Sequence, residues 1–190
     1  MRGMRVVSVV NTGDFDARKA QVVGEIYQRL TDARTVLPPA VAFVFDRETR
    51  KPADLERIRE ACGGMAYFLK RRCLECYLIH PRAISHTLSL LPGGKEIGPE
   101  VVNEWIDAHW KQERYGYRDA MADERANWLP VCDAARFLDE LFVKLTGTRE
   151  TYDKVRDGER LVRWLAQNDA GALHEVTDVL KQALNVDGEG

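Results

Sequence analysis

The sequence has no long apolar run. None of its apolar stretches approaches the about 20 residues that a transmembrane helix needs. At the amino end, only the short run 6–10 follows the first arginines, which is less than the apolar region of a secretory signal peptide. We therefore expect a soluble, cytoplasmic protein that has no membrane partner.

An excess of charge of either sign is also absent. The 28 lysines and arginines nearly balance 30 aspartates and glutamates, so the net charge is −2. This balance excludes a strongly basic protein that coats nucleic acid through bulk electrostatics, and any contact with an anionic polymer must be local. At 190 residues, 45% of them apolar, the chain can bury the core of one domain or of a domain with an appended one.

Cysteine is scarce. The four cysteines are Cys62, Cys73, Cys76 and Cys132. They are too few and too scattered for a disulfide framework. Cys73 and Cys76 form a C-x-x-C pair, and with His80 and His86 they could supply zinc or redox chemistry, but zinc ligand pairs normally lie on separate elements about 12 or more residues apart. Small buried thiols are the preferred interpretation, and zinc or redox chemistry is the alternative.

The first part of the chain alternates strand-like and helical segments. The predicted strands cover 5–10, 41–45 and 65–69, and the predicted helices cover 16–30 and 53–62. This alternation predicts an α/β unit in which a parallel sheet of about three strands is flanked by helices. A further helical segment, 75–91, is interrupted at Pro81, and Pro92-Gly93-Gly94 marks the end of the unit.

The second part of the chain is predicted to be helical. Apolar residues recur at helical spacing over 99–115, 133–145, 158–166 and 172–184. We therefore expect an α/β domain over 1–94, a helical subdomain over 95–186 and a disordered tail over 187–190.

Two acidic residues follow the predicted strand 41–45. Asp46 and Glu48 are separated by one residue, so both point to one face if the strand geometry persists. The carboxyl ends of strands are the usual place for a site in an open α/β sheet, and paired carboxylates attract a proton or a hard cation such as Mg²⁺ or Mn²⁺. The alternative is an ordinary charged loop that leads to a helix beginning at Pro52.

Cations follow the next predicted strand, 65–69. In a parallel sheet Arg71 and Arg72 reach the same edge as the acidic pair, and arginine is suited to bidentate contacts with phosphate. The alternative is a solvated charge cluster or a salt bridge to the acidic pair. Glu75 lies among apolar neighbours and therefore needs a partner, either an arginine or a metal ion.

These two segments together resemble a known family. The acidic pair is followed by a helix, a strand and the motif Arg71-Arg72-x-x-Glu75-x-Tyr77-Leu78-x-x-Pro81-x-Ala83-Ile84. This order is similar to the second half of the Toprim domain in the OLD (overcoming lysogenization defect) nucleases and related ATPase-associated proteins. The later segment 137–161 resembles the helical part of that family, in which a lysine, here Lys154, completes the active site. The resemblance covers roughly residues 5–184.

The resemblance implies metal-dependent cleavage of a DNA phosphodiester. It implies Mg²⁺ or Mn²⁺ as cofactor and DNA as substrate, with an ATPase partner chain or a second copy of this chain as further partners. Asp46, Glu48 and Glu75 are the expected metal ligands. Glu75 and Lys154 are the expected catalytic residues, and Arg71 and Arg72 the expected phosphate-binding residues.

The sequence departs from the family in three ways. The family's domain opens with a strand that carries a glutamate, and neither that strand nor a P-loop, GxxxxGK[ST], is found. The acidic pair is Asp-x-Glu instead of Asp-x-Asp. We therefore expect the C-terminal part of a larger ATPase–nuclease, or a chain completed by a partner, that is weakly active or inactive alone.

Two other functions remain open. One is a non-enzymatic module that binds protein or DNA and carries a degenerate Toprim site. The other is a phosphotransferase or phosphohydrolase that uses Asp46 as a nucleophile.

Overall fold

The structure is a computed structural model that describes residues 42–92, 96–116, 124–147 and 150–184. The chain divides into two compact units. The first unit combines Met1–Phe43 with Lys51–Tyr67, and the second combines Val44–Arg50 with Phe68–Gly190. Every predicted site residue belongs to the second unit.

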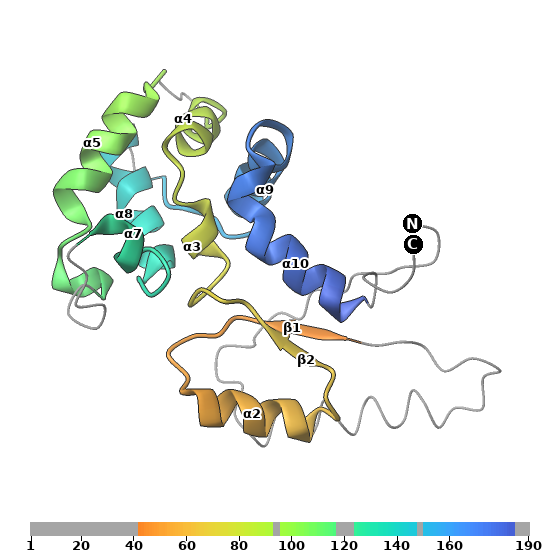
Figure 1. Cartoon of the computed structure of the whole chain (residues 1–190). Helices are drawn as coiled ribbons and strands as arrows, with labels where there is room; N and C mark the ends of the chain where they lie inside the picture. The colour runs from red at the N-terminus through yellow and green to blue at the C-terminus, as the bar shows by residue number, and fades with distance from the viewer. Residues whose placement is uncertain (1–41, 93–95, 117–123, 148–149, 185–190) are drawn as a thin grey trace. The chain divides into compact units, whose positions relative to one another are not determined.

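The described residues form more helix than strand (Figure 1). The strands are β1 (Phe43–Phe45) and β2 (Ala66–Phe68), and the 3₁₀ helices are η1 (Glu113–Tyr115) and η2 (Ala170–Leu173). The α-helices are α2 (Pro52–Ala61), α3 (Glu75–Leu78), α4 (Pro81–Ser89), α5 (Pro99–His109), α7 (Arg125–Trp128), α8 (Ala134–Thr146), α9 (Arg156–Asn168) and α10 (His174–Ala183). The fold class is α/β, as predicted.

β1 and β2 pair as a two-stranded parallel sheet. Phe43 donates its N–H to the carbonyl oxygen of Met65 at 2.9 Å, and Leu69 donates to that of Phe45 at 3.0 Å. Two of the predicted strands are thus confirmed with shorter bounds. The predicted strand 5–10 and helix 16–30 lie outside the described residues, so a Toprim-like sheet of three strands stays a prediction.

In the first unit, α2 (Pro52–Ala61) lies one residue earlier in the chain than the helix predicted over 53–62. Pro52 occupies the first turn, where its missing N–H is not needed. Ile58 and Cys62 are buried on one face. The chain leaves the helix through Gly63 and Gly64, whose φ angles of 61° and 82° favour glycine.

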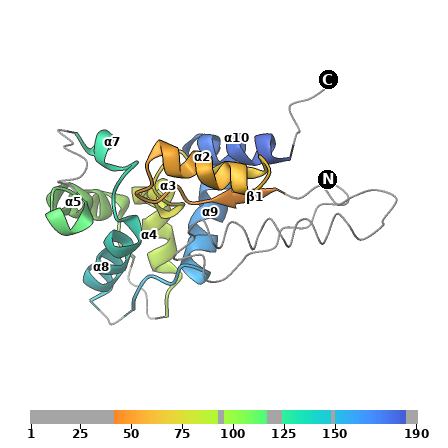
Figure 2. The same ribbon diagram turned by 90° about the horizontal axis from the view of Figure 1, so that it is seen from below.

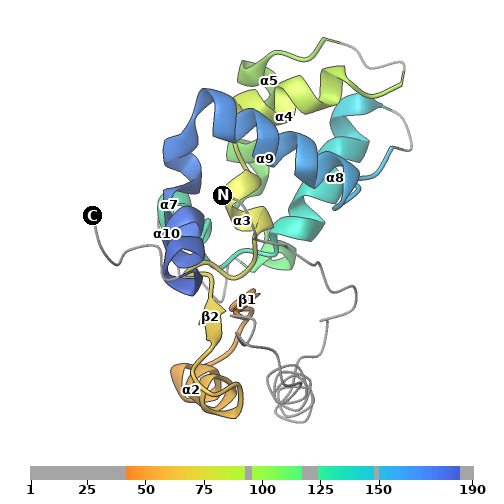
Figure 3. The ribbon, with the colours of Figure 1, turned by 90° about the vertical axis from the view of Figure 1, so that its right-hand side faces the viewer.

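The second unit is built from packed helices. α4 lies between α5 and α9 and contacts both (Figure 3). The short helix α3 contacts α8 and α9. α5 and α10 lie on opposite sides of α3 and α4 (Figure 2). α3 and α4, which the sequence analysis assigned to the α/β domain, thus pack with the later helices.

An aromatic cluster forms the core of the second unit. The ring of Phe137 meets those of Trp105, Tyr115 and Trp128 edge-on, with centroids 4.9–5.1 Å apart. Phe137, Tyr115 and Trp128 are fully buried. The indole N–H of Trp128 donates to the carbonyl oxygen of Tyr115 at 3.2 Å, so the one polar atom of this ring is paired.

The helical periodicity of the sequence is reproduced in the second unit. The segments 75–91, 99–115, 133–145, 158–166 and 172–184 correspond to α3 with α4, α5 with η1, α8, α9, and η2 with α10. α7 was not predicted, because four residues are too few to show a helical period. The tail 187–190 lies outside the described residues. Among the helices that the structure describes, none has the length and apolarity to cross a bilayer.

Truncation of the central ring tests this core. Phe137→Ala removes the ring that joins three other aromatics, so it should lower the free energy of unfolding by about 3–5 kcal/mol. Urea denaturation followed by tryptophan fluorescence measures this loss. The control Val101→Ala changes a residue that is 47% exposed and should cost under about 0.5 kcal/mol. Equal effects of the two substitutions would contradict the described packing.

Candidate functional site

The segment after β1 is bound to the segment after β2. Asp46 accepts a hydrogen bond through Oδ1 from the N–H of Leu74 at 3.0 Å. Glu48 donates its N–H to the carbonyl oxygen of Arg72 at 2.7 Å. Glu48 has a φ of 54° and is the one non-glycine residue with positive φ in the described part of the chain. Such a conformation is uncommon outside glycine, so the surrounding contacts hold this turn in place.

Glu75 is a buried acid at the start of α3, with 7% of its surface exposed. Its partner is Lys154, whose Nζ lies 3.1 Å from Oε1 of Glu75. Lys154 precedes α9 and is far from Glu75 in sequence. The partner expected for Glu75 is thus a lysine. Among the described contacts, Glu75 is paired with neither Arg71 nor Arg72.

The electrostatics place Asp46 in the same cluster. Burial is the main cause that raises the pKa of Asp46 to about 6. The carboxylates of Glu75 and Glu48 raise it further, whereas the N–H of Leu74 and the ammonium of Lys154 lower it. The structure therefore brings Asp46, Glu48, Glu75 and Lys154 together from three segments of the chain. We call these four residues the acidic cluster.

A second set of contacts fixes the segment that carries Lys154. Asp153 accepts hydrogen bonds through Oδ1 from the N–H groups of Val155 and Arg156, at 2.9 and 2.7 Å. Asp157 is fully buried and is bound by the guanidinium of Arg156 through two contacts of 2.9 Å. Burial acts to raise the pKa of Asp157, but the hydrogen bonds from Arg156 and from the N–H of Asp153 outweigh it, so this pKa is lowered.

Tyr152 lies in the same segment and has an unusual hydroxyl group. The residue is 8% exposed, and its hydroxyl oxygen is buried without a hydrogen-bond partner among the described residues. Burial and then the charge of Glu75 raise the pKa of this phenol. Sequence reasoning gave Tyr152 no role. Its position two residues before Lys154 was the one signal available.

The two arginines differ in their surroundings. Arg71 donates from Nη1 to the carbonyl oxygen of Cys76 at 2.9 Å, lies 3.3 Å from Glu175 on α10, and stacks 4.3 Å above the ring of Tyr77. Its guanidinium thus ties α10 to α3. Arg72 lies 4.0 Å from the carboxylate of Glu48, at the acidic cluster. Of the two, Arg72 is better placed to meet a phosphate there.

The donor set of the acidic cluster suits a hard cation. Carboxylate oxygens are the ligands that Mg²⁺ and Mn²⁺ prefer. The pKa of Asp46 is raised chiefly by burial and then by the charge of Glu75, and a bound cation would oppose both effects. In the described part of the chain, no three or more histidine, cysteine, aspartate or glutamate side chains are grouped closely enough to hold a metal ion. Cation binding would therefore have to draw Asp46, Glu48 and Glu75 closer together.

The C-x-x-C pair lies among buried thiols. The Sγ atoms of Cys73 and Cys76 are 3.6 Å apart, and that of Cys132 lies 4.0 Å from Cys76. The hydrogen bond with Cys132 is the main cause that raises the pKa of Cys76 to about 12, and the pKa of Cys73 is raised by its bond to Cys76 and by burial. Protonated, buried thiols are poor nucleophiles and poor ligands, which favours the structural interpretation.

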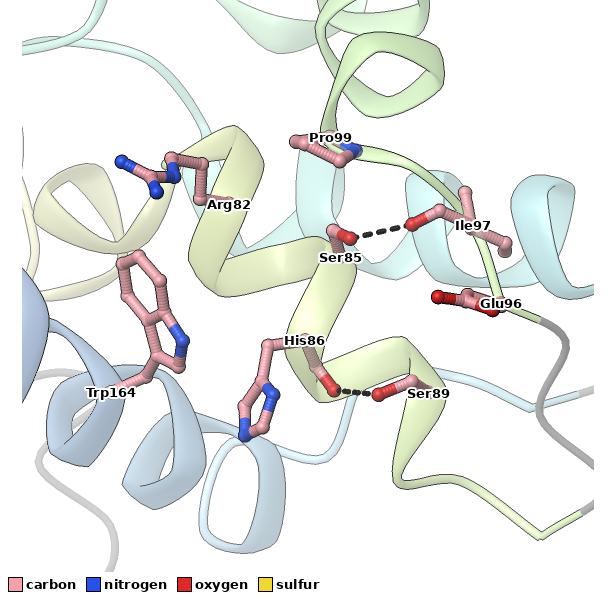
Figure 4. A pocket seen from close by; sticks show the side chains of 8 residues that line it. All are labelled: Arg82, Ser85, His86, Ser89, Glu96, Ile97, Pro99 and Trp164. Atoms are coloured by element: carbon pink, nitrogen blue, oxygen red, sulfur yellow. Dashed lines mark hydrogen bonds between the residues drawn. The ribbon is translucent and has the colours of Figure 1, made fainter.

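A separate hollow of about 520 Å³ lies between α4, the start of α5 and α9 (Figure 4). It is lined by Arg82, Ser85, His86, Ser89, Glu96, Ile97, Pro99 and Trp164. Ser85 donates to the carbonyl oxygen of Ile97, and Ser89 to that of His86. The hollow is polar and open, and it contains no residue of the acidic cluster.

Comparison with known proteins adds no family. No protein-family model, curated protein or solved structure matches the chain. Any functional assignment therefore rests on the residues of the acidic cluster and on their contacts.

The raised pKa of Asp46 gives a pH-dependent prediction for stability. The folded state holds an extra proton between about pH 4 and 6, so stability falls as pH rises through that window and stays lower above it. Asp46→Asn removes the charge and keeps an oxygen for the N–H of Leu74. It should raise the melting temperature by a few degrees at pH 7.5, and this gain should disappear below pH 4.

Thermal melts of both proteins between pH 3.5 and 8 measure this difference. The control Glu159→Gln neutralises a carboxylate that is 66% exposed and should give no comparable pH-dependent gain. A loss of stability at pH 7.5 in Asp46→Asn, or a gain that does not vary with pH, would contradict the electrostatic description of the cluster.

The cysteine environment predicts slow chemical modification. All four thiols are free and buried. At pH 7.5 a thiol reagent should label the native chain slowly, and urea should expose four reactive groups at once. Mass spectrometry with a timed alkylation measures the rates. Fast labelling of Cys73 or Cys76 in the native chain would instead favour redox or ligand chemistry.

Proposed function

We propose that this chain is the nuclease module of an OLD-like ATPase–nuclease and hydrolyses DNA phosphodiesters with Mg²⁺ or Mn²⁺. The observation that carries the proposal is the contact between Glu75 and Lys154 beside Asp46. These residues come from separate segments, and they are the ones to which the Toprim resemblance gives catalytic or metal-binding roles. A buried acid paired with a lysine from a distant segment, beside a half-buried acid of raised pKa, is a pattern that occurs at functional sites.

Each residue of the site has a role in this reaction. Asp46, Glu48 and Glu75 would hold the divalent cation, which supplies a Lewis acid that activates water and offsets the charge on the phosphate. Lys154 carries its ammonium on a side chain that is 66% exposed, within reach of an incoming phosphate oxygen. Arg72 lies beside Glu48 and can turn its guanidinium to the phosphate backbone of DNA. Arg71 positions α10 and α3.

We expect low activity from the isolated chain. The glutamate strand and the ATPase of the family would come from an ATPase partner chain, and a second copy of this chain is the other proposed partner. DNA is held weakly without such a partner, because the net charge of −2 provides little general attraction for a polyanion.

Nicking of supercoiled plasmid tests the proposal. The chain should nick DNA slowly with Mn²⁺ or Mg²⁺ and not at all with EDTA. Asp46→Ala and Lys154→Ala should bring nicking below detection, because they remove a metal ligand and the cation at the phosphate. Lys144→Ala, which changes an exposed lysine on α8, is the matched control and should leave the rate unchanged.

A binding measurement separates a weak enzyme from an incorrect assignment. Electron paramagnetic resonance should detect Mn²⁺ bound by the folded chain and lost in Asp46→Ala. If the wild-type chain binds no Mn²⁺, or if nicking persists in Asp46→Ala, the site assignment is wrong.

The second candidate function is a non-enzymatic module that binds protein or DNA. The observation in its favour is that Lys154 already neutralises Glu75, and that the described acids are not grouped as a ready metal site. This module would fold and bind its partner without taking up Mn²⁺. The Mn²⁺ measurement therefore distinguishes the two functions.

A further inference from the structure

The hydroxyl of Tyr152 is the one buried side-chain polar atom that has no hydrogen-bond partner in the described part of the chain. Buried polar groups are almost always paired, because an unpaired group has lost its hydrogen bonds to water without replacement. An orphan hydroxyl in a segment this well fixed needs a physical explanation. A partner that is reached in another state of the site is one such explanation.

Glu75 is the candidate acceptor for this hydroxyl. Tyr152 lies two residues before Lys154, whose Nζ is 3.1 Å from Oε1 of Glu75, and the charge of Glu75 is, after burial, the main cause that raises the pKa of this phenol. Asp157 already accepts from Arg156, Arg160 and the N–H of Asp153. The carboxylate of Glu75 has one described partner, Lys154, at Oε1. A carboxylate can accept several hydrogen bonds, so Glu75 can also accept one from a phenol.

The ring and the backbone of Tyr152 are held by groups other than Glu75. A Cβ atom added at Gly158 would lie 3.1 Å from the Tyr152 hydroxyl, so the backbone of α9 is close there. The ring packs edge-on against Phe142, with centroids 5.4 Å apart. The N–H of Tyr152 is held by Asp139 at 3.2 Å. The backbone and the ring of Tyr152 are thus held in place, and its hydroxyl is the group left without a partner in the described residues.

The two side chains of the ion pair between Lys154 and Glu75 differ in their exposure to solvent. The side chain of Lys154 is 66% exposed, whereas that of Glu75 is 10% exposed. An exposed ammonium is easily drawn to an anion in solution, because a solvent-screened ion pair is weak. A buried carboxylate that loses its partner is costly and needs another donor.

We propose that Tyr152 is a positioning residue, whose hydroxyl donates a hydrogen bond to Glu75 when Lys154 leaves that carboxylate for an anion. The exchange keeps the carboxylate of Glu75 hydrogen-bonded and in place while the ammonium is free. The identity of the anion, a DNA phosphate, rests on the proposed function. The exchange of hydrogen-bond partners at Glu75 is independent of that function.

A double-mutant cycle tests the exchange without metal or DNA. Tyr152→Phe removes the orphan hydroxyl and should not lower the melting temperature. Lys154→Met keeps the aliphatic stem and should cost little, because Tyr152 takes over Glu75. The double variant leaves Glu75 without either donor, so its melting temperature should fall by about 2–4 °C more than the sum of the single changes.

Two controls show whether the coupling passes through Glu75. Tyr115→Phe removes a hydroxyl that donates to Glu140 at 2.9 Å, and with Lys154→Met it should give additive effects. In a Glu75→Gln background the coupling between Tyr152→Phe and Lys154→Met should disappear, because the buried charge is gone. Additive effects in the first cycle overturn the proposal. So does a coupling that persists in Glu75→Gln.

A kinetic readout applies where nicking is measured. Tyr152→Phe should lower kcat at least tenfold and leave KM within twofold, because the hydroxyl acts only after Lys154 has moved to the phosphate. An unchanged kcat with intact coupling in the melts would show that the exchange occurs but that cleavage does not depend on it, which overturns the positioning role. Failure of nicking in the wild-type chain would count against the proposed function alone.

Discussion

The ion pair between Glu75 and Lys154 is the interaction on which the second unit's candidate site depends. A carboxyl group with 7% exposure is costly to bury without a polar partner, and its contact with Lys154 fixes where the segment before α9 lies. That segment is in turn held by Asp157, a buried acid that is satisfied by Arg156. The Glu75–Lys154 pair thus connects α3 to the segment before α9, and Asp157 joins that segment to the first turn of α9.

Three locally unfavourable features lie in the segments around this ion pair. Asp46 has a raised pKa, Glu48 adopts positive φ, and the hydroxyl of Tyr152 has no partner. In the described residues, Glu48 and Tyr152 are the sole cases of their kind. Asp157, by contrast, is a buried acid whose carboxylate accepts hydrogen bonds from Arg156, Arg160 and the N–H of Asp153. The contrast is typical of a site where binding, and not stability, determines the residues.

Much of the fold could be predicted from the sequence, and the reasons differ between elements. Helical periodicity located α2, α5, α8, α9 and α10, because each buries one apolar face. Two apolar runs that end in charged residues located β1 and β2. The third predicted strand, 5–10, lies outside the described residues, and α7 is too short to carry a period.

The candidate site could be predicted only in part. Asp46 and Glu48 follow from their place after β1, but no pattern pairs Glu75 with Lys154, since nothing local relates residues so far apart. The resemblance to the Toprim family named Lys154, and the fold supplied its partner. Arg71 shows the limit of local reasoning, because Glu175 and the ring of Tyr77 occupy its guanidinium. These contacts depend on how α10 packs.

The charge balance of the acidic cluster bears on whether the site is active or degenerate. If Lys154 had replaced a lost cation permanently, its ammonium would be expected to hold the neighbouring acids in their ionised form, as Arg156 does for Asp157. Asp46 instead keeps a pKa near 6 although Lys154 is close, because burial and the charges of Glu75 and Glu48 outweigh that ammonium. The ammonium of Lys154 therefore does not return the pKa of Asp46 to its usual range, chiefly because this carboxyl is partly buried. In the proposed function, a divalent cation would be the group that favours its ionised form.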